Sequence, residues 1–295
     1  MIVVTGATGN VGVPLVQTLA HAGESVIAVS RKGIGVPDGV RHHRADLAEP
    51  RTLGPVLRGA AGLFLLTSPE FMANGDIDAV LDEVRAAEVP RVVLLSSHGV
   101  GTGWHPSVLE EAVQRSGLEW TMLRPGNFDS NALQWADTVR TQRMVAAPFG
   151  DVAVPAVDPA DIAEVAAIAL REPGHQGHVY TLTGPEPISP RRQAEAIGAA
   201  LGEPVRFVEQ SRAEARTQML RYMPEPVVEA TLGALGTPSA AERAVSPDVD
   251  ACSDDRLAHS ANGCRAPSLP SVDESRIPRA GQPVITITEY TARIL

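Results

Sequence analysis

Lysine, cysteine and aromatic residues are all scarce in this chain of 295 residues. The single lysine, Lys32, excludes every mechanism that needs a catalytic lysine elsewhere. Two cysteines, Cys252 and Cys264, are too few for a disulfide framework or for a zinc site made of cysteines alone. His175 and His178 have metal-like spacing but no carboxylate or thiol nearby, so we expect no metal site. Aromatic residues make up 4% of the chain, which argues against stacking surfaces for single-stranded nucleic acid.

Long apolar runs and an early basic segment are also missing. No uninterrupted apolar run reaches the roughly 20 residues that span a bilayer. No basic residue precedes Arg31, so we do not expect a secretory signal. Acidic residues outnumber basic ones by 35 to 25, a net charge of −10, which argues against direct contact with nucleic acid or an anionic membrane. We expect a cytoplasmic protein, and the sequence leaves open whether it is a monomer or a homodimer.

Strand-like and helix-like segments alternate through the first half of the chain. Short runs typical of strands occur at 2–5, 25–30, 40–43, 62–67, 91–96 and 119–124. Helical spacing of apolar residues occurs between them, at 11–22, 51–58, 77–87 and 107–116. This alternation predicts right-handed βαβ units, and therefore an α/β Rossmann fold with a doubly wound parallel sheet.

After Gly126 the pattern changes to helices with isolated strands. Helices are expected at 132–145, 159–171 and 190–201, one or two helices at 212–235, and strands at 179–183 and 205–208. We predict a nucleotide-binding Rossmann domain at 1–150, with 153–174 packed on it, and a small C-terminal α+β substrate lobe at 175–236. Residues 237–295 are rich in Ser, Pro, Asp, Ala and Arg without an apolar period, which predicts an irregular tail.

A glycine-rich turn follows the first predicted strand and opens the first predicted helix. It reads Thr-Gly-Ala-Thr-Gly-Asn-Val-Gly from residue 5. Glycines at such a turn permit a tight bend, close approach to a pyrophosphate and close helix–strand packing, and the helix N-terminus attracts phosphate. The predicted cofactor-binding residues are Gly6, Thr8, Gly9, Asn10 and Val11. The alternative is a glycine-rich turn without a ligand, and the absence of Gly-Lys-Ser/Thr excludes a P-loop.

The end of the second predicted strand favours one form of the cofactor. An acidic residue at this place usually holds the ribose hydroxyls of NAD(H), but this chain has Ser30-Arg31-Lys32. Adjacent cations suit the 2′-phosphate of NADP(H), which an arginine grips through its planar fork. We therefore predict that Arg31 and Lys32 bind NADP(H) in preference to NAD(H). The alternative is a solvated basic turn.

Together these motifs resemble those of the NmrA-like group of atypical short-chain dehydrogenases/reductases, which includes NADPH-dependent quinone reductases. The resemblance covers about residues 1–235. It also rests on segments after four later strands: Ala45–Leu47, Leu65–Pro69, Leu95–Ser97 and Leu123–Phe128. It implies that Asp46 and Leu47 flank the adenine, and that Thr67, Ser68 and Pro69 line the path toward the nicotinamide.

The chain departs from the wider superfamily in its acid/base residues. That superfamily uses a Tyr-x-x-x-Lys pair, in which lysine lowers the pKa of the tyrosine that passes a proton to a carbonyl oxygen. None of Tyr180, Tyr222 and Tyr290 precedes a lysine. Reduction of a quinone demands less, because an electron-poor ring accepts hydride with water or a weak donor supplying the proton.

We predict NADPH-dependent reduction of a quinone or a similar small electron acceptor. The missing Tyr/Lys pair fits an alternative equally well: a redox sensor that binds NADP(H) without turnover and acts through a protein partner. A third alternative is an inactive product of a damaged gene.

Three residues are candidates for catalysis, namely Ser97, His105 and Asn127. His105 could donate a proton near neutral pH, although a loop histidine also caps helices or faces solvent. Ser97 either contacts a ligand or bonds only to backbone, and its neighbour His98 is a further polar group that could reach a substrate carbonyl. Asn127 either orients the nicotinamide amide or shapes its turn.

The tail carries a sign of a changed reading frame. Proteins that this chain resembles commonly end in a segment similar to Gly-Arg-Pro-Pro-Arg-Thr-Phe followed by Glu-Trp, which this chain lacks. Back-translation of Ala251–Cys264 from the third base of the Ala251 codon permits that segment. The overlap of the Asp254 and Asp255 codons permits only Arg or a stop. We hypothesise a frameshift near Asp250, which resequencing of the gene would test and an intact frame would refute.

Overall fold

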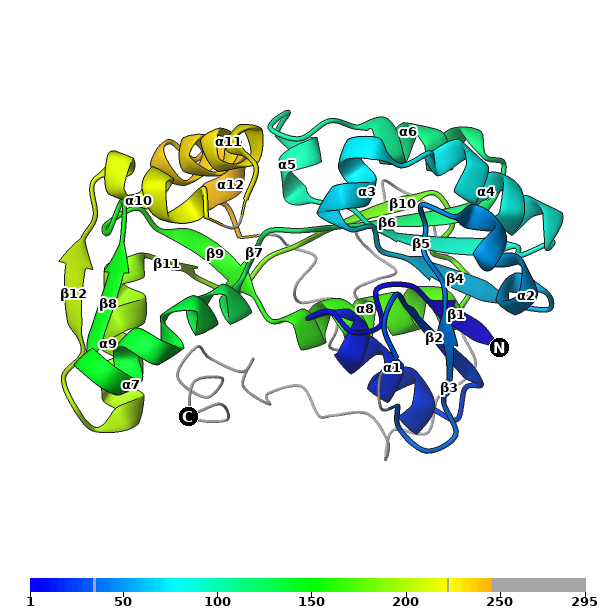
Figure 1. Cartoon of the computed structure of the whole chain (residues 1–295), viewed down its shortest axis with the longest axis horizontal. Helices are drawn as coiled ribbons and strands as arrows, with labels where there is room; N and C mark the ends of the chain where they lie inside the picture. The colour runs from blue at the N-terminus through cyan, green and yellow to red at the C-terminus, as the bar shows by residue number, and fades with distance from the viewer. Residues whose placement is uncertain (34–35, 222, 246–295) are drawn as a thin grey trace. The chain divides into compact units, whose positions relative to one another are not determined.

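The structure is a computed structural model that describes residues 1–33, 36–221 and 223–245. The chain divides into two compact units (Figure 1). Unit 1 comprises Met1–Pro125 and Pro159–Leu182, and unit 2 comprises Gly126–Asp158 with the described residues from Thr183 onward. The predicted tail beyond residue 245 and the segment of the frameshift hypothesis lie outside the described residues.

Unit 1 is built on a seven-stranded parallel sheet with the strand order β10-β6-β5-β4-β1-β2-β3. Its strands are β1 (Ile2–Val4), β2 (Val26–Ser30), β3 (Arg41–Arg44), β4 (Gly62–Leu65), β5 (Arg91–Leu95), β6 (Glu119–Pro125) and β10 (His178–Leu182). The predicted Rossmann fold is confirmed. The strand order reverses between β1 and β4, which is the place where such sheets bind ligands, beyond the carboxyl ends of the strands.

Helices cover both faces of this sheet (Figure 1). On one side α1 (Gly12–His21) packs against α8 (Pro159–Arg171), which also contacts β4, β5 and β6. On the other side α4 (Ile77–Ala86) packs against α2 (Gly54–Leu57) and α6 (Val108–Arg115). Shorter helices follow three strands: η1 (Pro50–Thr52), α3 (Pro69–Asn74) and α5 (His98–Gly101).

Alternating strand residues build the two halves of the core. Val3, Leu63 and Val92 belong to one buried cluster that also contains Val80 and Leu81 of α4. Successive strand residues point to opposite faces of a sheet. The neighbours of these residues at positions 4, 64 and 93 are equally buried, so they pack toward the other face. Burial on both faces explains why these strands read as continuous apolar runs.

Unit 2 contains two small sheets. One has the order β11-β9-β7, with β7 (Asn127–Phe128), β9 (Val154–Val157) and β11 (Pro187–Ile188), and the other pairs β8 (Met144–Ala147) with β12 (Arg206–Glu209). Its helices are η2 (Asp129–Trp135), α7 (Ala136–Gln142), α9 (Pro190–Leu201), α10 (Arg212–Met219), α11 (Glu225–Gly236) and α12 (Ala240–Arg243). Apolar residues of η2, α7, β8 and α9 form a small core: Trp135, Val139, Val145, Ala147, Ala194 and Ile197.

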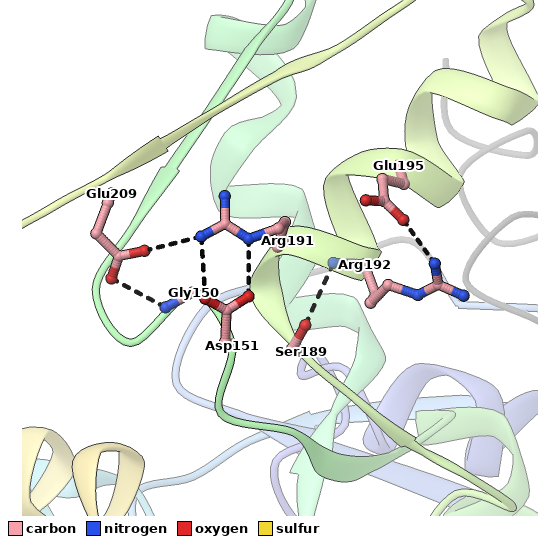
Figure 2. Close-up of polar contacts among 7 residues, drawn as sticks. All are labelled: Gly150, Asp151, Ser189, Arg191, Arg192, Glu195 and Glu209. Atoms are coloured by element: carbon pink, nitrogen blue, oxygen red, sulfur yellow. Dashed lines mark hydrogen bonds and ion pairs between the residues drawn. The ribbon is translucent and has the colours of Figure 1, made fainter.

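Arg191 joins three segments of unit 2 (Figure 2). Its guanidinium donates to both carboxylate oxygens of Asp151, at 2.8 and 3.1 Å, and lies 3.5 Å from Glu209. The same group lies 4.6 Å from the centre of the Phe207 ring. The backbone N–H of Gly150 donates to Glu209 at 3.0 Å, and a Cβ on Gly150 would lie 2.4 Å from that carboxylate. The cluster therefore fixes the turn after β8 against the start of α9 and the end of β12.

The structure differs from the sequence prediction in several places, and two of them change the unit to which a segment belongs. The strand predicted within the substrate lobe is β10, which pairs with β6 at the edge of the Rossmann sheet. The helix predicted at 132–145 ends at Gln142, because Arg143 adopts a left-handed φ of 50° and the chain enters β8. Since β8 pairs with β12, residues 126–150 lie in unit 2, whereas the sequence assigned them to the nucleotide-binding domain.

Within the described ranges, none of the helices combines the length and the apolar character that crossing a bilayer requires.

Candidate functional site

The glycines of the turn between β1 and α1 are required by its geometry. Gly6 has a φ of +63°, and a Cβ there would lie 2.7 Å from the side chain of Leu66. At Gly12, the first residue of α1, a Cβ would lie 2.1 Å from the carbonyl oxygen of Gly6. The N–H of Gly9 donates to that same carbonyl at 2.9 Å and closes the turn. A larger residue at Gly6 or Gly12 would force this turn open.

The N-terminus of α1 suits an anionic group. Val11, which precedes the helix, has no side-chain oxygen to cap it, and the first turn carries no acidic residue. Thr8 and Asn10 are exposed, while Gly9 is half-buried. A helix N-terminus without a carboxylate presents the positive end of its dipole to phosphate oxygens. The residues present therefore fit the pyrophosphate of a dinucleotide.

Thr5 joins the glycine-rich turn to the end of β4. Its hydroxyl donates to the carbonyl oxygens of Phe64 and Leu66, at 3.0 and 3.1 Å, and accepts from the N–H of Leu66 at 2.8 Å. Together with the contact between Gly6 and Leu66, these bonds place the segment after β4 beside the turn.

That segment leads directly into α3. Thr67 and Ser68 are half-buried, and Pro69 is exposed as the first residue of the helix. The hydroxyl of Ser68 accepts from the N–H of Phe71 at 3.2 Å and caps α3. No pattern in the sequence predicted this short helix. Because Ser68 caps it, the direction of the chain at Thr67 is fixed.

Both cations after β2 are exposed at the surface of unit 1. The guanidinium of Arg31 lies 3.7 Å from Glu70 of α3, and both side chains are more than half exposed, which makes this a weak ion pair. The hydroxyl of Ser30 donates to the carbonyl of Lys32 at 2.5 Å and lies 2.9 Å from Nε2 of His42. These bonds order the turn that carries the cations.

The ends of β2 and β3 lie on the same edge of the sheet as the glycine-rich turn. The N–H of Ala7 donates to Val29 at 3.3 Å, and the N–H of Ala45 donates to Ser30 at 3.2 Å. Asp46 follows Ala45, is half-buried, and accepts from the N–H of Ala48 at 3.0 Å. Leu47, beside it, is also half-buried. A polar and an apolar side chain therefore stand next to each other at the end of β3.

Ser97 and His105 lie together at the end of β5. Nδ1 of His105 lies 2.9 Å from the hydroxyl oxygen of Ser97, which also accepts from the N–H of Gly99 at 3.1 Å. The N–H of His105 donates to the carbonyl of Gly99 at 3.0 Å. A Cβ on Gly99 would lie 2.6 Å from Nδ1, so the glycine makes room for the imidazole ring. Ser97 thus caps α5 and contacts a titratable side chain at once.

His98 lies next to this pair in a different environment. Both of its ring nitrogens are buried, and neither has a hydrogen-bond partner among the residues that the structure describes. A neutral imidazole carries one donor and one acceptor, so each buried nitrogen lacks the bond it could make.

A buried ion pair supports the end of β5. The guanidinium of Arg124 donates to both carboxylate oxygens of Glu110, at 2.9 and 2.5 Å, and the hydroxyl of Ser96 donates to the same carboxylate. Burial raises the pKa of Glu110, but the hydrogen bonds from Arg124 and Ser96 outweigh it and hold that pKa below its usual value. A Cβ on Gly101 of α5 would lie 3.0 Å from Arg124. Glu110 was not predicted from the sequence, because one carboxylate on a predicted helix carries no signal.

The remaining predicted residues lie elsewhere. Asn127 is exposed in unit 2, where its backbone pairs with Ala156 of β9, whereas the other predicted site residues all lie in unit 1. His175 is buried, with Nδ1 2.8 Å from the hydroxyl of Tyr180. In the described part of the chain, no group of three or more side chains is arranged to hold a metal ion.

The fold is shared with proteins that bind nicotinamide dinucleotides. A family model described as NAD(P)H-binding matches residues 6–173. The chain belongs to this NAD(P)H-binding family. The predicted nicotinamide cofactor and the resemblance to NmrA-like reductases are thereby confirmed.

Several curated relatives are reductases. A (4-alkanoyl-5-oxo-2,5-dihydrofuran-3-yl)methyl phosphate reductase of Streptomyces griseus is 37% identical, across 79% of this chain and 85% of the relative. The NAD(P)H azoreductase of Xenophilus azovorans is 33% identical, across 78% and 84%. Quinone oxidoreductase 2 of Escherichia coli is 25% identical, across 72% and 79%. These relatives support an oxidoreductase as the class of this family member.

Solved structures share the fold. The triphenylmethane reductase of Citrobacter superposes with a TM-score of 0.73 at 21% identity, across 85% of this chain and 93% of that one. The NADPH complex of the Escherichia coli quinone oxidoreductase gives 0.70 at 23%, across 84% and 93%. A mutant NmrA gives 0.65 at 19%, across 99% and 94%.

Proposed function

We propose that this NAD(P)H-binding protein reduces a quinone, or a similar electron-poor small molecule, with hydride from NADPH. The observation that carries the proposal is the turn at Gly6 and Gly12, where a side chain has no room and the uncapped helix N-terminus follows. It lies where the strand order reverses, so it fits a pyrophosphate at the ligand-binding edge of the sheet.

The predicted cofactor contacts follow the same edge of unit 1. We assign the pyrophosphate to Gly6, Thr8, Gly9, Asn10 and Val11. The adenine is assigned to the adjacent polar and apolar side chains of Asp46 and Leu47, and the path of the nicotinamide to Thr67, Ser68 and Pro69. When bound, the cofactor supplies the hydride.

The choice of NADPH over NADH rests on Arg31 and Lys32. Both side chains are exposed after β2, at the place where cofactors without the 2′-phosphate usually meet an acidic residue. The only charged partner of Arg31 among the described residues is the weakly held Glu70 at 3.7 Å. A phosphate dianion with a bidentate arginine contact would displace such a pair.

The proposed class of acceptor rests on the lack of a strong proton donor of the Tyr/Lys type. Tyr180 is buried and bonded to His175, and it precedes no lysine. A strong proton donor of the Tyr/Lys type is therefore not available from this residue. Azo compounds and quinones, which two of the relatives are named for, are electron-poor and accept hydride with less assistance. Asn127 stays a candidate for orienting the nicotinamide amide.

The test is a titration of the purified protein with NADPH, NADP⁺ and NADH, followed by tryptophan fluorescence, and then a panel of quinones with NADPH consumption as the readout. Tight binding of NADPH with turnover supports the proposal. A preference for NADP⁺ without turnover supports the alternative of a redox sensor with a protein partner. Failure to bind any of the three overturns both.

A further inference from the structure

We propose that Ser97 and His105 form a proton relay that delivers the proton accompanying hydride transfer to the acceptor. The inference rests on the proposed reductase function and names the residues that complete its chemistry. It starts from the hydrogen bonds of one hydroxyl group.

The hydroxyl oxygen of Ser97 has two lone pairs and one proton. The N–H of Gly99 occupies one lone pair at 3.1 Å, and Nδ1 of His105, when protonated, occupies the other at 2.9 Å. Within the described part of the chain, no carbonyl or carboxylate accepts the proton of Ser97. With both lone pairs engaged, that proton is directed to an acceptor that is not part of the described chain.

The position of Ser97 matches the proposed path of the nicotinamide. Ser97 is the second residue after β5, and β5 pairs with β4 so that Leu94 stands opposite Leu65. The segments that follow β5 and β4 therefore both leave the sheet at its ligand-binding edge. An acceptor stacked near the nicotinamide would have its carbonyl oxygen at this same edge of the sheet.

His105 can pass a proton from solvent to the Ser97 hydroxyl group. The residue is exposed, Nδ1 faces Ser97, and Nε2 has no hydrogen-bond partner among the described residues. Imidazole changes its charge between about pH 5 and pH 8. Two charged groups near α5 are paired: Arg124 lies against Gly101 and is bonded to Glu110, and Glu111 accepts from Ser107. The other titratable side chain of α5 is His98, whose buried ring nitrogens have no hydrogen-bond partner among the described residues.

The hydride and the proton reach the acceptor from different donors. One oxygen of the quinone would take the hydride that bound NADPH supplies, which leaves NADP⁺. The second oxygen of the quinone takes the proton of Ser97 as its O–H bond forms. Ser97 recovers a proton from Nδ1–H of the His105 imidazolium, which leaves the neutral ring protonated at Nε2, and solvent then returns a proton to Nδ1. One hydride and one proton convert the quinone to the hydroquinone.

The experiment compares His105→Gln and Ser97→Ala with the wild-type protein, using NADPH and a benzoquinone. We expect unchanged NADPH affinity and a fall in kcat of about 10- to 100-fold, within the range of general acid catalysis. We expect the wild-type kcat to fall as pH rises and His105→Gln to lose this dependence, because a glutamine side chain neither gains nor loses a proton. Ser97→Thr, which keeps the hydroxyl, retains activity.

Two matched variants serve as controls. Ser107→Ala removes a serine bonded to Glu111 on α6, and His178→Gln removes a half-buried histidine outside the proposed site. We expect both to keep the wild-type pH profile.

Gly99→Ala places a Cβ 2.6 Å from Nδ1 of His105 and should lower kcat as His105→Gln does.

The outcomes separate the relay from the proposed function. A wild-type pH profile in His105→Gln, or full activity in Ser97→Ala, overturns the relay and leaves the reductase standing. A wild-type protein that binds NADPH but reduces no quinone overturns both.

Discussion

Glu110 of α6 and Arg124 of β6 form an ion pair inside unit 1, with the carboxylate only 4% exposed. The guanidinium donates to both oxygens, at 2.9 and 2.5 Å, and Ser96 donates to the same carboxylate. The pair therefore connects the end of β5, which carries Ser97, to the strand and helix that follow it. Its partners are 14 residues apart in sequence.

Removing the charge of Glu110 should destabilise the protein strongly. In Glu110→Gln the guanidinium of Arg124 stays largely buried without a counter-charge, which costs about 3 kcal/mol of the free energy of unfolding. Urea unfolding measures the change. Glu111→Gln is the matched control, because Glu111 is exposed and its pair with Arg115 should contribute less than about 1 kcal/mol. Equal losses of unfolding free energy in the two variants would show that the buried pair stabilises the protein no more than the exposed pair does.

His175 should make the stability of the protein depend on pH. Burial lowers the pKa of His175 below its ordinary value of 6.5, and the charges of His178 and Arg91 lower it further. The unfolded chain therefore binds a proton more readily than the folded protein below pH 6.5. The contribution of His175 to the free energy of unfolding is complete above pH 6.5. It is lost as pH falls toward the pKa of His175 in the folded protein.

The measurement is urea unfolding of the wild-type protein and of His175→Gln, between about pH 7 and pH 5. We expect the free energy of unfolding of the wild-type protein to fall over this range. The fall should be smaller in His175→Gln. Parallel curves for the two proteins would assign the pH dependence to other groups.

Charge at the end of β2 should select the cofactor. Arg31→Ala removes the fork that we assign to the 2′-phosphate, so NADPH affinity should fall about tenfold while NADH affinity stays unchanged. Glu70→Gln removes the carboxylate 3.7 Å from Arg31 and should tighten NADPH binding. Fluorescence titration with both cofactors tests this, with Arg85→Ala on α4 as an exposed arginine control. Equal losses for NADPH and NADH in Arg31→Ala would refute the assignment.

Gly12 should tolerate no side chain. In Gly12→Ala the new Cβ would lie 2.1 Å from the carbonyl oxygen of Gly6, so the turn must shift away from the conformation to which we assign phosphate binding. We expect NADPH binding to be lost and the free energy of unfolding to fall by about 2 kcal/mol. Gly33→Ala is the matched control, because a Cβ there meets nothing within 4 Å. Unchanged NADPH binding in Gly12→Ala would contradict the proposed pyrophosphate site.

Local patterns in the sequence were sufficient for the Rossmann framework. Strands such as β4 and β5 are buried on both faces, so they read as continuous apolar runs, and the helices between them keep a 3.6-residue period. The turn at Gly6 and the cations at Arg31 were equally visible, because a tight turn needs glycine and a phosphate needs positive charge wherever the chain goes afterward. Each of these signals is written in a few adjacent residues.

Contacts between distant segments were decided only by the tertiary structure. The sequence placed His178–Leu182 in the substrate lobe, but these residues pair with β6 across more than 50 positions of sequence. It listed Ser97 and His105 separately, and only the path of α5 brings Nδ1 within 2.9 Å of the hydroxyl. No sequence pattern predicted that Glu70 lies beside Arg31 or that Glu110 lies beside Arg124. Periodicity reports which face of an element is buried, but the partner that buries it depends on strand order and packing, which no local pattern contains.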